Sequence, residues 1–77
     1  MSDSAIAVKL GTVIRRRREA LGLSQEGLAA LSELNRTYLG KIERGEVIAS
    51  IVTLQKIAEG LNVKLSELIL LYEQEGQ

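Results

Sequence analysis

The chain has 77 residues, of which 10 are basic and 10 acidic, and it contains neither cysteine nor histidine. This length suits one small domain with a single core, and without cysteine no disulfide can stabilise it. The usual zinc ligands and the commonest general base are also absent, so we expect no metal, no cofactor and no enzymatic activity.

The absence of proline and the three-to-four spacing of apolar residues predict an all-α fold of five helices. A first helix is expected over residues 4–21, and Gly22 follows it where a left-handed C-terminal cap belongs. The residues of this helix predicted to face inward are Ile6, Leu10, Val13, Ile14 and Leu21. Ser24 is a suitable N-cap for a second helix, whose predicted core residues are Leu28, Ala29 and Leu31.

Asn35 and Gly45 are expected to begin and end a third helix, with Leu39 and Ile42 in the core. Ser50 is the predicted N-cap of a fourth helix, and Asn62 takes the left-handed position after it. The apolar stripe of this fourth helix consists of Ile51, Leu54, Ile57, Ala58 and Leu61. A fifth helix begins near residues 64–66, includes an apolar face and frays through residues 73–77. Its apolar residues include Leu68, Ile69 and Leu71.

Charge differs between the two halves of the chain. Residues 1–44 contain eight basic and five acidic side chains, whereas residues 45–77 contain two basic and five acidic ones. A basic first half is suited to contact with phosphate groups. No apolar run approaches the roughly 20 residues of a membrane span, and the N-terminus lacks the apolar core of a signal peptide. We therefore expect a cytoplasmic protein with no membrane partner.

Residues 24–45 form two short predicted helices joined by a tight turn, and Leu34 in the turn helps to fix their crossing. The outward or oblique residues of the second of these helices are Arg36, Thr37, Gly40, Lys41 and Arg44. Arginine and lysine donate to guanine O6 and N7, and the methyl group of threonine packs on that of thymine. The start of the other helix offers free N–H groups to a phosphate beside Gln25. This arrangement suits a protein that places one helix in the major groove of DNA.

Four sequence motifs carry a resemblance that covers about residues 8–71. They are Ser24-Gln25-Glu26 with Leu28-Ala29, then Arg36-Thr37-Tyr38-Leu39, Ile42-Glu43-Arg44-Gly45 and Leu54-Gln55-Lys56-Ile57-Ala58. With these motifs the chain resembles the Cro/C1-type (XRE) helix-turn-helix family. Within that family, Arg-Thr-Tyr combined with Ile-Glu-Arg-Gly is most similar to the controller proteins of restriction–modification systems.

The resemblance implies a single five-helix, lambda-repressor-like DNA-binding domain over residues 1–77. The helix-turn-helix occupies about residues 24–45, and a dimerisation surface lies within about residues 50–72. Such a domain is expected to regulate transcription as a homodimer on a palindromic operator in double-stranded DNA. RNA polymerase is a further candidate partner, and no small-molecule substrate is expected.

The resemblance also assigns roles to single residues. The implied base-contacting residues are Arg36, Thr37 and Lys41. The implied contacts to the DNA backbone come from Gln25, Asn35, Tyr38 and Arg44, although Tyr38 is also suited to packing at the edge of the domain. Glu43 is expected to pair with Arg18 and so to lock the third helix in place. The rest of the basic run at residues 15–18 spreads around a helix, so most of it is expected to be solvated or paired.

The last two predicted helices carry more apolar residues than one small core can use. An apolar excess of this kind tends to mark an interface. The residues expected to form a dimer interface are Val52, Leu65, Leu70, Leu71 and Tyr72. The alternative is that the last helix merely covers the core of the monomer.

Two features depart from the family pattern. Glu33 stands in the turn where glycine is usual, and a positive φ there costs a residue with a side chain about 1 kcal/mol. Residues 46–49 form an apolar loop that lacks the usual polar side chains. These departures keep open a protein-interaction module, such as an antitoxin-type domain that binds a partner, and a phage-type repressor is a further alternative. Selective, salt-dependent binding to duplex DNA separates the regulator from the interaction module.

Overall fold

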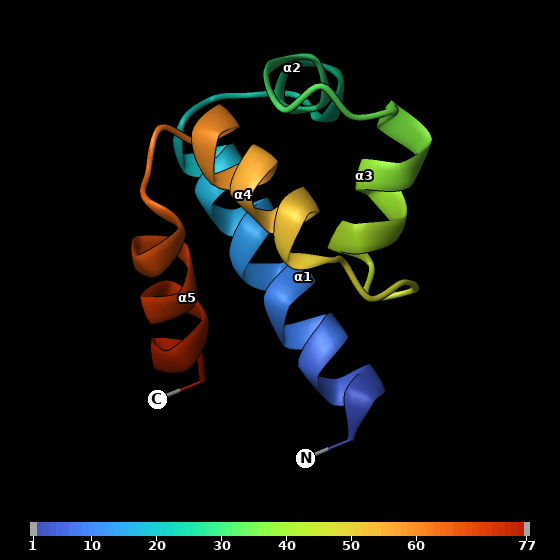
Figure 1. Ribbon diagram of the computed structural model, residues 1–77, viewed down its shortest axis with the longest axis vertical. Coiled ribbons are helices and arrows are strands. Elements are labelled where there is room, and N and C mark those ends of the chain that lie inside the picture. The colour runs from blue at the N-terminus through green and yellow to red at the C-terminus, as the bar shows by residue number, and fades with distance from the viewer. Residues whose placement is uncertain (1, 77) are drawn as a thin grey trace.

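The computed structural model describes residues 2–76, so residues 1 and 77 of the predicted domain lie outside the described residues. The described residues form five α-helices and no strand, which confirms the all-α prediction (Figure 1). The helices are α1 (Asp3–Ala20), α2 (Gln25–Leu31), α3 (Arg36–Glu43), α4 (Ile51–Gly60) and α5 (Leu65–Gln74).

Short polar side chains begin the first four helices. The side chains of Ser24, Asn35 and Ser50 each accept a hydrogen bond from the backbone N–H three residues further on, as predicted. Ser2 does the same for α1. These bonds satisfy N–H groups that have no partner within the helix. Local chemistry therefore determines where each of these helices begins.

Residues with positive φ end three of the helices and form the turn between α2 and α3. Gly22 and Gly45 both have a φ of 72°, and Asn62 has a φ of 58°, as expected for left-handed caps. Glu33 has a φ of 55°, which confirms that the turn requires this conformation even without glycine. At Gly45 space matters as well, because a Cβ atom would lie 2.6 Å from Cα of Val8.

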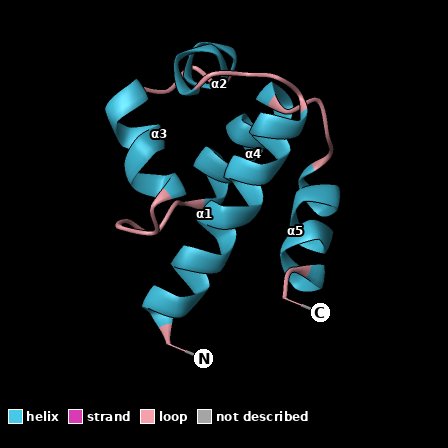
Figure 2. Ribbon diagram, turned by 180° about the vertical axis from the view of Figure 1, so that it is seen from behind, coloured by secondary structure: helices cyan, strands magenta, loops and turns pink. Residues whose placement is uncertain are grey.

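The long helix α1 lies between α3 and α5, and α2 crosses the top of the molecule (Figures 1 and 2). Helix α1 contacts both α3 and α5, and α4 contacts both α2 and α5. One core lies between these helices. Its buried residues are Val13, Ile14, Leu28, Ala29, Leu39, Ile42, Leu54, Ile57, Ala58, Leu61 and Leu68.

Four residues predicted to lie in the core are exposed instead. They are Ile6, Leu21, Leu31 and Ile51, with exposed fractions of 39–62%. Each lies at or near the end of a helix, where the apolar spacing continues but the neighbouring helix no longer covers it. At the end of α2 the buried position is taken by Ser32, which is 1% exposed.

Helices α1 and α3 approach closely at Gly11. A Cβ atom on Gly11 would lie 2.3 Å from the carbonyl oxygen of Ile42 and 2.5 Å from that of Glu43. Any larger residue would therefore collide with the backbone of α3. This glycine, which is conformationally costly inside a helix, fixes how deeply α3 sits against α1.

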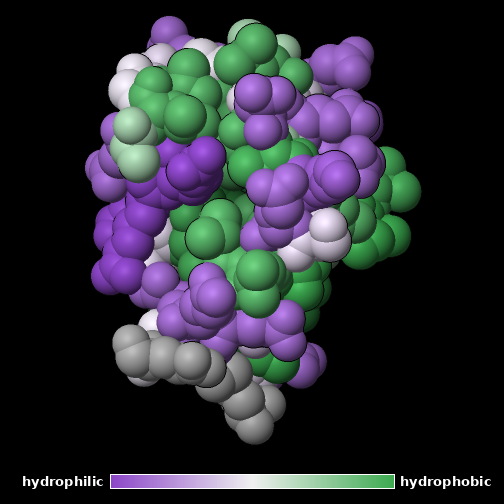
Figure 3. Space-filling view, turned by 90° about the vertical axis from the view of Figure 1, so that its left-hand side faces the viewer, coloured by the Kyte–Doolittle hydropathy of each residue, from purple (hydrophilic) through white to green (hydrophobic). Residues whose placement is uncertain are grey.

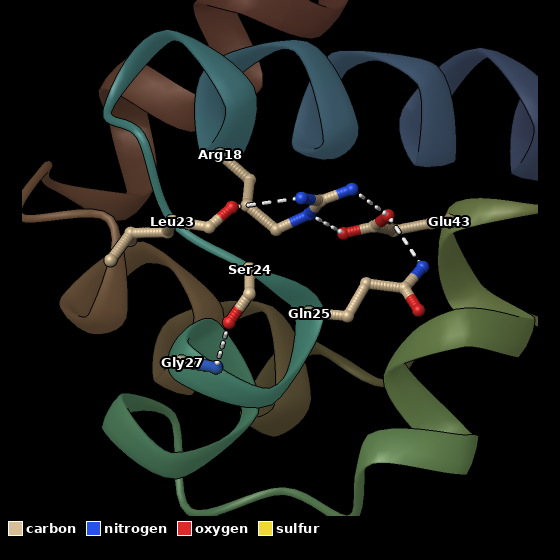
Figure 4. A network of polar contacts seen from close by, with 6 residues as sticks. All are labelled: Arg18, Leu23, Ser24, Gln25, Gly27 and Glu43. Carbon is tan, nitrogen blue, oxygen red and sulfur yellow. Dashed lines mark hydrogen bonds and ion pairs between the residues drawn. The ribbon is translucent and has the colours of Figure 1, made fainter.

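A buried ion pair locks α3 against α1 beside this contact (Figure 4). Arg18 Nε donates to Glu43 Oε2 at 2.7 Å, and Arg18 Nη2 donates to Glu43 Oε1 at 3.0 Å. The two side chains are 11% and 1% exposed, respectively. Arg18 Nη1 also donates to the carbonyl oxygen of Leu23 at 2.8 Å, and Gln25 Nε2 donates to Glu43 Oε1 at 3.1 Å. The network thus joins α1, the start of α2 and the end of α3.

Hydrogen bonding to Glu43 raises the pKa of Arg18 above its ordinary value, although burial acts in the opposite direction. The ion pair thus favours the charged form of the guanidinium. A buried charge without its partner is costly, so the pair is best tested by removing one member at a time.

Replacing either partner alone should destabilise the fold strongly. We expect Glu43→Leu and Arg18→Met each to lower the free energy of unfolding by about 3 kcal/mol, because each leaves an uncompensated buried charge. The double variant Arg18→Met/Glu43→Leu should lose clearly less than the sum of the two single losses. Urea unfolding followed by circular dichroism measures all three.

The control is Arg16→Met, also on α1, which removes the exposed ion pair between Arg16 and Glu75. An exposed pair contributes little, so this variant should unfold almost like the wild type. The structural role of the buried pair would be contradicted if the losses in the free energy of unfolding at Arg18 and Glu43 were strictly additive. It would also be contradicted if neither loss exceeded that of the control.

Candidate nucleic-acid interface

Helix α3 has a buried face and an exposed face. Leu39 and Ile42 are 0% and 2% exposed, and they attach the helix to the core. The opposite face exposes the three predicted base-contacting residues, Arg36, Thr37 and Lys41. Thr37 and Lys41 share one side of the helix because they are four residues apart, and Arg36 precedes them in its exposed first turn. The structure therefore presents a short cationic surface along α3.

Gly40, which was predicted to lie outward or oblique on this helix, is buried. A Cβ atom at Gly40 would lie 3.0 Å from Arg44 Nη1 and 3.8 Å from Gln25 Oε1. The side chains of Arg44 and Gln25 thus lie across this position and cover it. Any contact of DNA with α3 at this level involves those side chains and not the glycine backbone.

The residues predicted to contact the DNA backbone surround α3, but they differ in their exposure and in their contacts within the protein. Arg44 and Asn35 are exposed, and Asn35 Oδ1 accepts the cap hydrogen bond from the N–H of Tyr38 at 3.2 Å. Gln25 is half-buried, with its amide nitrogen bound to Glu43. Tyr38 is half-buried and packs against the core, in agreement with the edge-packing alternative. Gln25 and Tyr38 therefore have structural contacts in addition to any contact with DNA.

Sequence reasoning missed two carboxylates beside the exposed arginines. Glu26, in the first turn of α2, places Oε1 3.7 Å from Nε of Arg36. Glu46, just beyond α3, forms an ion pair with Arg44. The pair of Glu46 and Arg44 is close in sequence and could have been found by its spacing. The pair of Glu26 and Arg36 spans the turn, so only the crossing of α2 and α3 reveals it.

The five residues predicted for the dimer interface separate into two groups. Val52 and Leu70 are 62% and 51% exposed. Leu65 and Leu71 pack against the core, and the ring of Tyr72 lies under Lys9 Nζ, 4.6 Å from the ring centroid. Helix α5 therefore covers the monomer core with part of its apolar surface. Figure 3, in which the side of α5 faces the viewer, shows that hydrophobic patches remain between hydrophilic side chains.

Apolar side chains line several surface grooves, two of which concern the predicted dimer surface and the loop of residues 46–49. One lies along α4 and is lined in part by Ile51, Val52 and Leu65. The other, of about 300 Å³, lies between the first turns of α1 and the loop of residues 46–49. Val47 and Ala49 of that loop pack against the core. The loop thus closes one end of the fold through Val47 and Ala49, whereas Ile48 is 70% exposed.

Residues 2–76 show neither a metal-binding cluster nor a membrane-spanning helix. No group of three or more aspartate, glutamate, cysteine or histidine side chains within that range is arranged to hold a metal ion. None of the helices in the described part of the chain is both long and apolar enough to cross a membrane.

Comparison with known proteins identifies the family. Residues 14–68 match the family model described as "Helix-turn-helix". The chain is 42% identical over 71 residues to the control protein C.MunI of a Mycoplasma species, a match that covers 91% of this chain and 96% of the relative.

Solved structures agree in both sequence and shape. The restriction-modification controller protein C.AhdI from Aeromonas hydrophila superimposes with a TM-score of 0.81 at 47% identity, over 83% of this chain and 97% of that one. The wild-type restriction-modification controller protein C.Esp1396I gives a TM-score of 0.85 at 34% identity, over 91% of each chain. The five-helix arrangement is thus lambda-repressor-like, and the chain belongs to the Cro/C1-type helix-turn-helix family.

Proposed function

We propose that this DNA-binding transcriptional regulator is the controller protein of a restriction–modification system and acts as a homodimer on a palindromic operator. The observation that carries the proposal is the exposed face of α3, where Arg36, Thr37 and Lys41 project from a helix that is locked to α1. The relatives C.MunI, C.AhdI and C.Esp1396I are control or controller proteins, which supports the narrower assignment.

In this proposal α3 lies in the major groove and its exposed side chains contact base edges. Arg36 and Lys41 donate to guanine, and the methyl group of Thr37 packs against thymine. Arg44 and Asn35 donate to phosphate at the two ends of α3, and the N-terminus of α2 beside Gln25 faces another phosphate. Tyr38 lies near the backbone at the edge of the helix.

A second copy completes the site, because one domain of this size reads only half of a palindrome. We place the dimer surface on α4 and α5, where Val52 and Leu70 remain exposed. Two-fold symmetry then sets the half-sites about one helical turn apart. The protein regulates transcription by occupying the operator, and RNA polymerase is its further partner where the operator position favours activation.

Arg36 should carry much of the sequence preference. We expect Arg36→Ala to reduce the ratio of specific to non-specific affinity by about 5- to 150-fold, which corresponds to the roughly 1–3 kcal/mol of a base contact. Fluorescence anisotropy with a duplex selected from random DNA, and with a scrambled duplex of equal length, measures the ratio. The matched control is Arg15→Ala on α1, which removes an equal charge from an exposed position and should leave the ratio unchanged.

The result that contradicts the proposal is a selection in which no duplex binds the wild type above non-specific affinity. In that case the interaction module becomes the better description of the chain.

Val52 should be required for the dimer. A buried carboxylate at this position would oppose association, so we expect Val52→Glu to sediment as a monomer at concentrations at which the wild type is a dimer. Its affinity for the palindromic duplex should fall with it. Sedimentation velocity and anisotropy provide the two measurements.

The matched control is Leu31→Glu, which changes a residue of similar exposure, 58%, on α2. It should leave the sedimentation coefficient at the wild-type value. An unchanged dimer in Val52→Glu would place the interface elsewhere on the chain.

A further inference from the structure

The two exposed arginines on α3 and at its end each have a carboxylate neighbour. Arg36 and Glu26 are separated by 3.7 Å between Nε and Oε1, and Arg44 is paired with Glu46. The side chains of Arg36 and Glu26 are 61% and 79% exposed. Exposed pairs of this kind add little to the stability of a fold. They differ in this respect from the buried pair of Arg18 and Glu43.

The ion pair between Arg36 and Glu26 affects which groups of DNA can contact the start of α3. Glu26 belongs to the first turn of α2, and Arg36 is the first residue of α3. Because the two head groups lie side by side in the structure, a phosphate that approaches the guanidinium also approaches the carboxylate. A DNA phosphate competes with Glu26 for the guanidinium and is repelled by the carboxylate.

A base pair presents a different environment from a phosphate. Guanine offers O6 and N7 to arginine, and cytosine offers its N4 amino group to a glutamate oxygen. At a site with guanine and cytosine in suitable positions, Arg36 and Glu26 therefore each replace their mutual contact with a contact to a base. On non-specific DNA the contacts are mainly to phosphate, and the carboxylate gains no partner there.

We propose that Glu26 is a specificity-determining residue, which weakens the contact of Arg36 with phosphate and thereby favours sites where guanine receives Arg36 and cytosine receives Glu26. The inference rests on the proposed function, since it assumes that α3 reads DNA. It assigns the discrimination against non-specific DNA to a residue of α2 outside the set of base-contacting residues on α3.

The test compares Glu26→Gln with the wild type on the selected duplex and on the scrambled duplex of equal length. We expect the variant to bind the scrambled duplex about tenfold more tightly, because the repulsion between carboxylate and phosphate is removed. The ratio of specific to non-specific affinity should fall by about the same factor. The dependence of non-specific binding on salt should steepen by about one unit of slope, as one more phosphate contact forms.

Two controls isolate the pair. Glu19→Gln removes the same charge from an exposed position at the end of α1 and should leave the affinity ratio unchanged. In an Arg36→Ala background, Glu26→Gln should change that ratio clearly less than it does in the wild type, because only the direct repulsion between carboxylate and phosphate then remains. The thermal midpoint of Glu26→Gln should match that of the wild type, which separates the proposed role from one in stabilising α2.

The inference is overturned if Glu26→Gln leaves the affinity ratio unchanged, changes it no more than Glu19→Gln, or acts equally in the Arg36→Ala background. These results would leave the proposed function intact as long as the wild type prefers the selected duplex. A wild type without any preference would overturn both the proposed function and the inference.

Discussion

The position of α3 depends on the buried contact between Arg18 and Glu43. The two-point ion pair joins the first helix to the end of the third, and Gln25 extends the network to the start of α2. Gly11 allows the close backbone approach beside which this pair forms. Because the pair is buried, either charge without its partner would destabilise the fold. The exposed face of α3 is therefore presented at a fixed angle, as a reading helix requires.

Around α3 the arginine side chains are paired with acidic ones, so that they do not form a purely basic surface. The chain has no net charge, and its two exposed arginines on and beside α3 have carboxylate neighbours. Strongly basic surfaces bind any DNA through phosphate, so balanced charge favours selectivity over raw affinity. Apolar surface is divided in a similar way, because α5 covers the core while Val52 on α4 remains exposed, where we propose that a second copy binds.

Local chemistry made much of this fold predictable from the sequence. Caps such as Ser24 and the positive φ of Glu33 depend on a few neighbouring residues, and the core stripes follow helical spacing. Prediction failed at helix ends such as Leu31, where spacing cannot show that the covering helix has ended. It also failed at Gly40, which two distant side chains cover, and at Glu26, whose neighbour lies across a turn. These features depend on how helices cross, which a linear pattern does not contain.

We propose that α3, held in place by the buried pair of Arg18 and Glu43, is the surface that contacts DNA. The most direct test is a titration of the ¹⁵N-labelled protein with the selected duplex, followed by amide chemical shifts. We expect the largest changes in α3 and in the first turn of α2, with the amides of α5 little affected by the duplex. Changes confined to α4, α5 or residues 46–49, with α3 unperturbed, would contradict it.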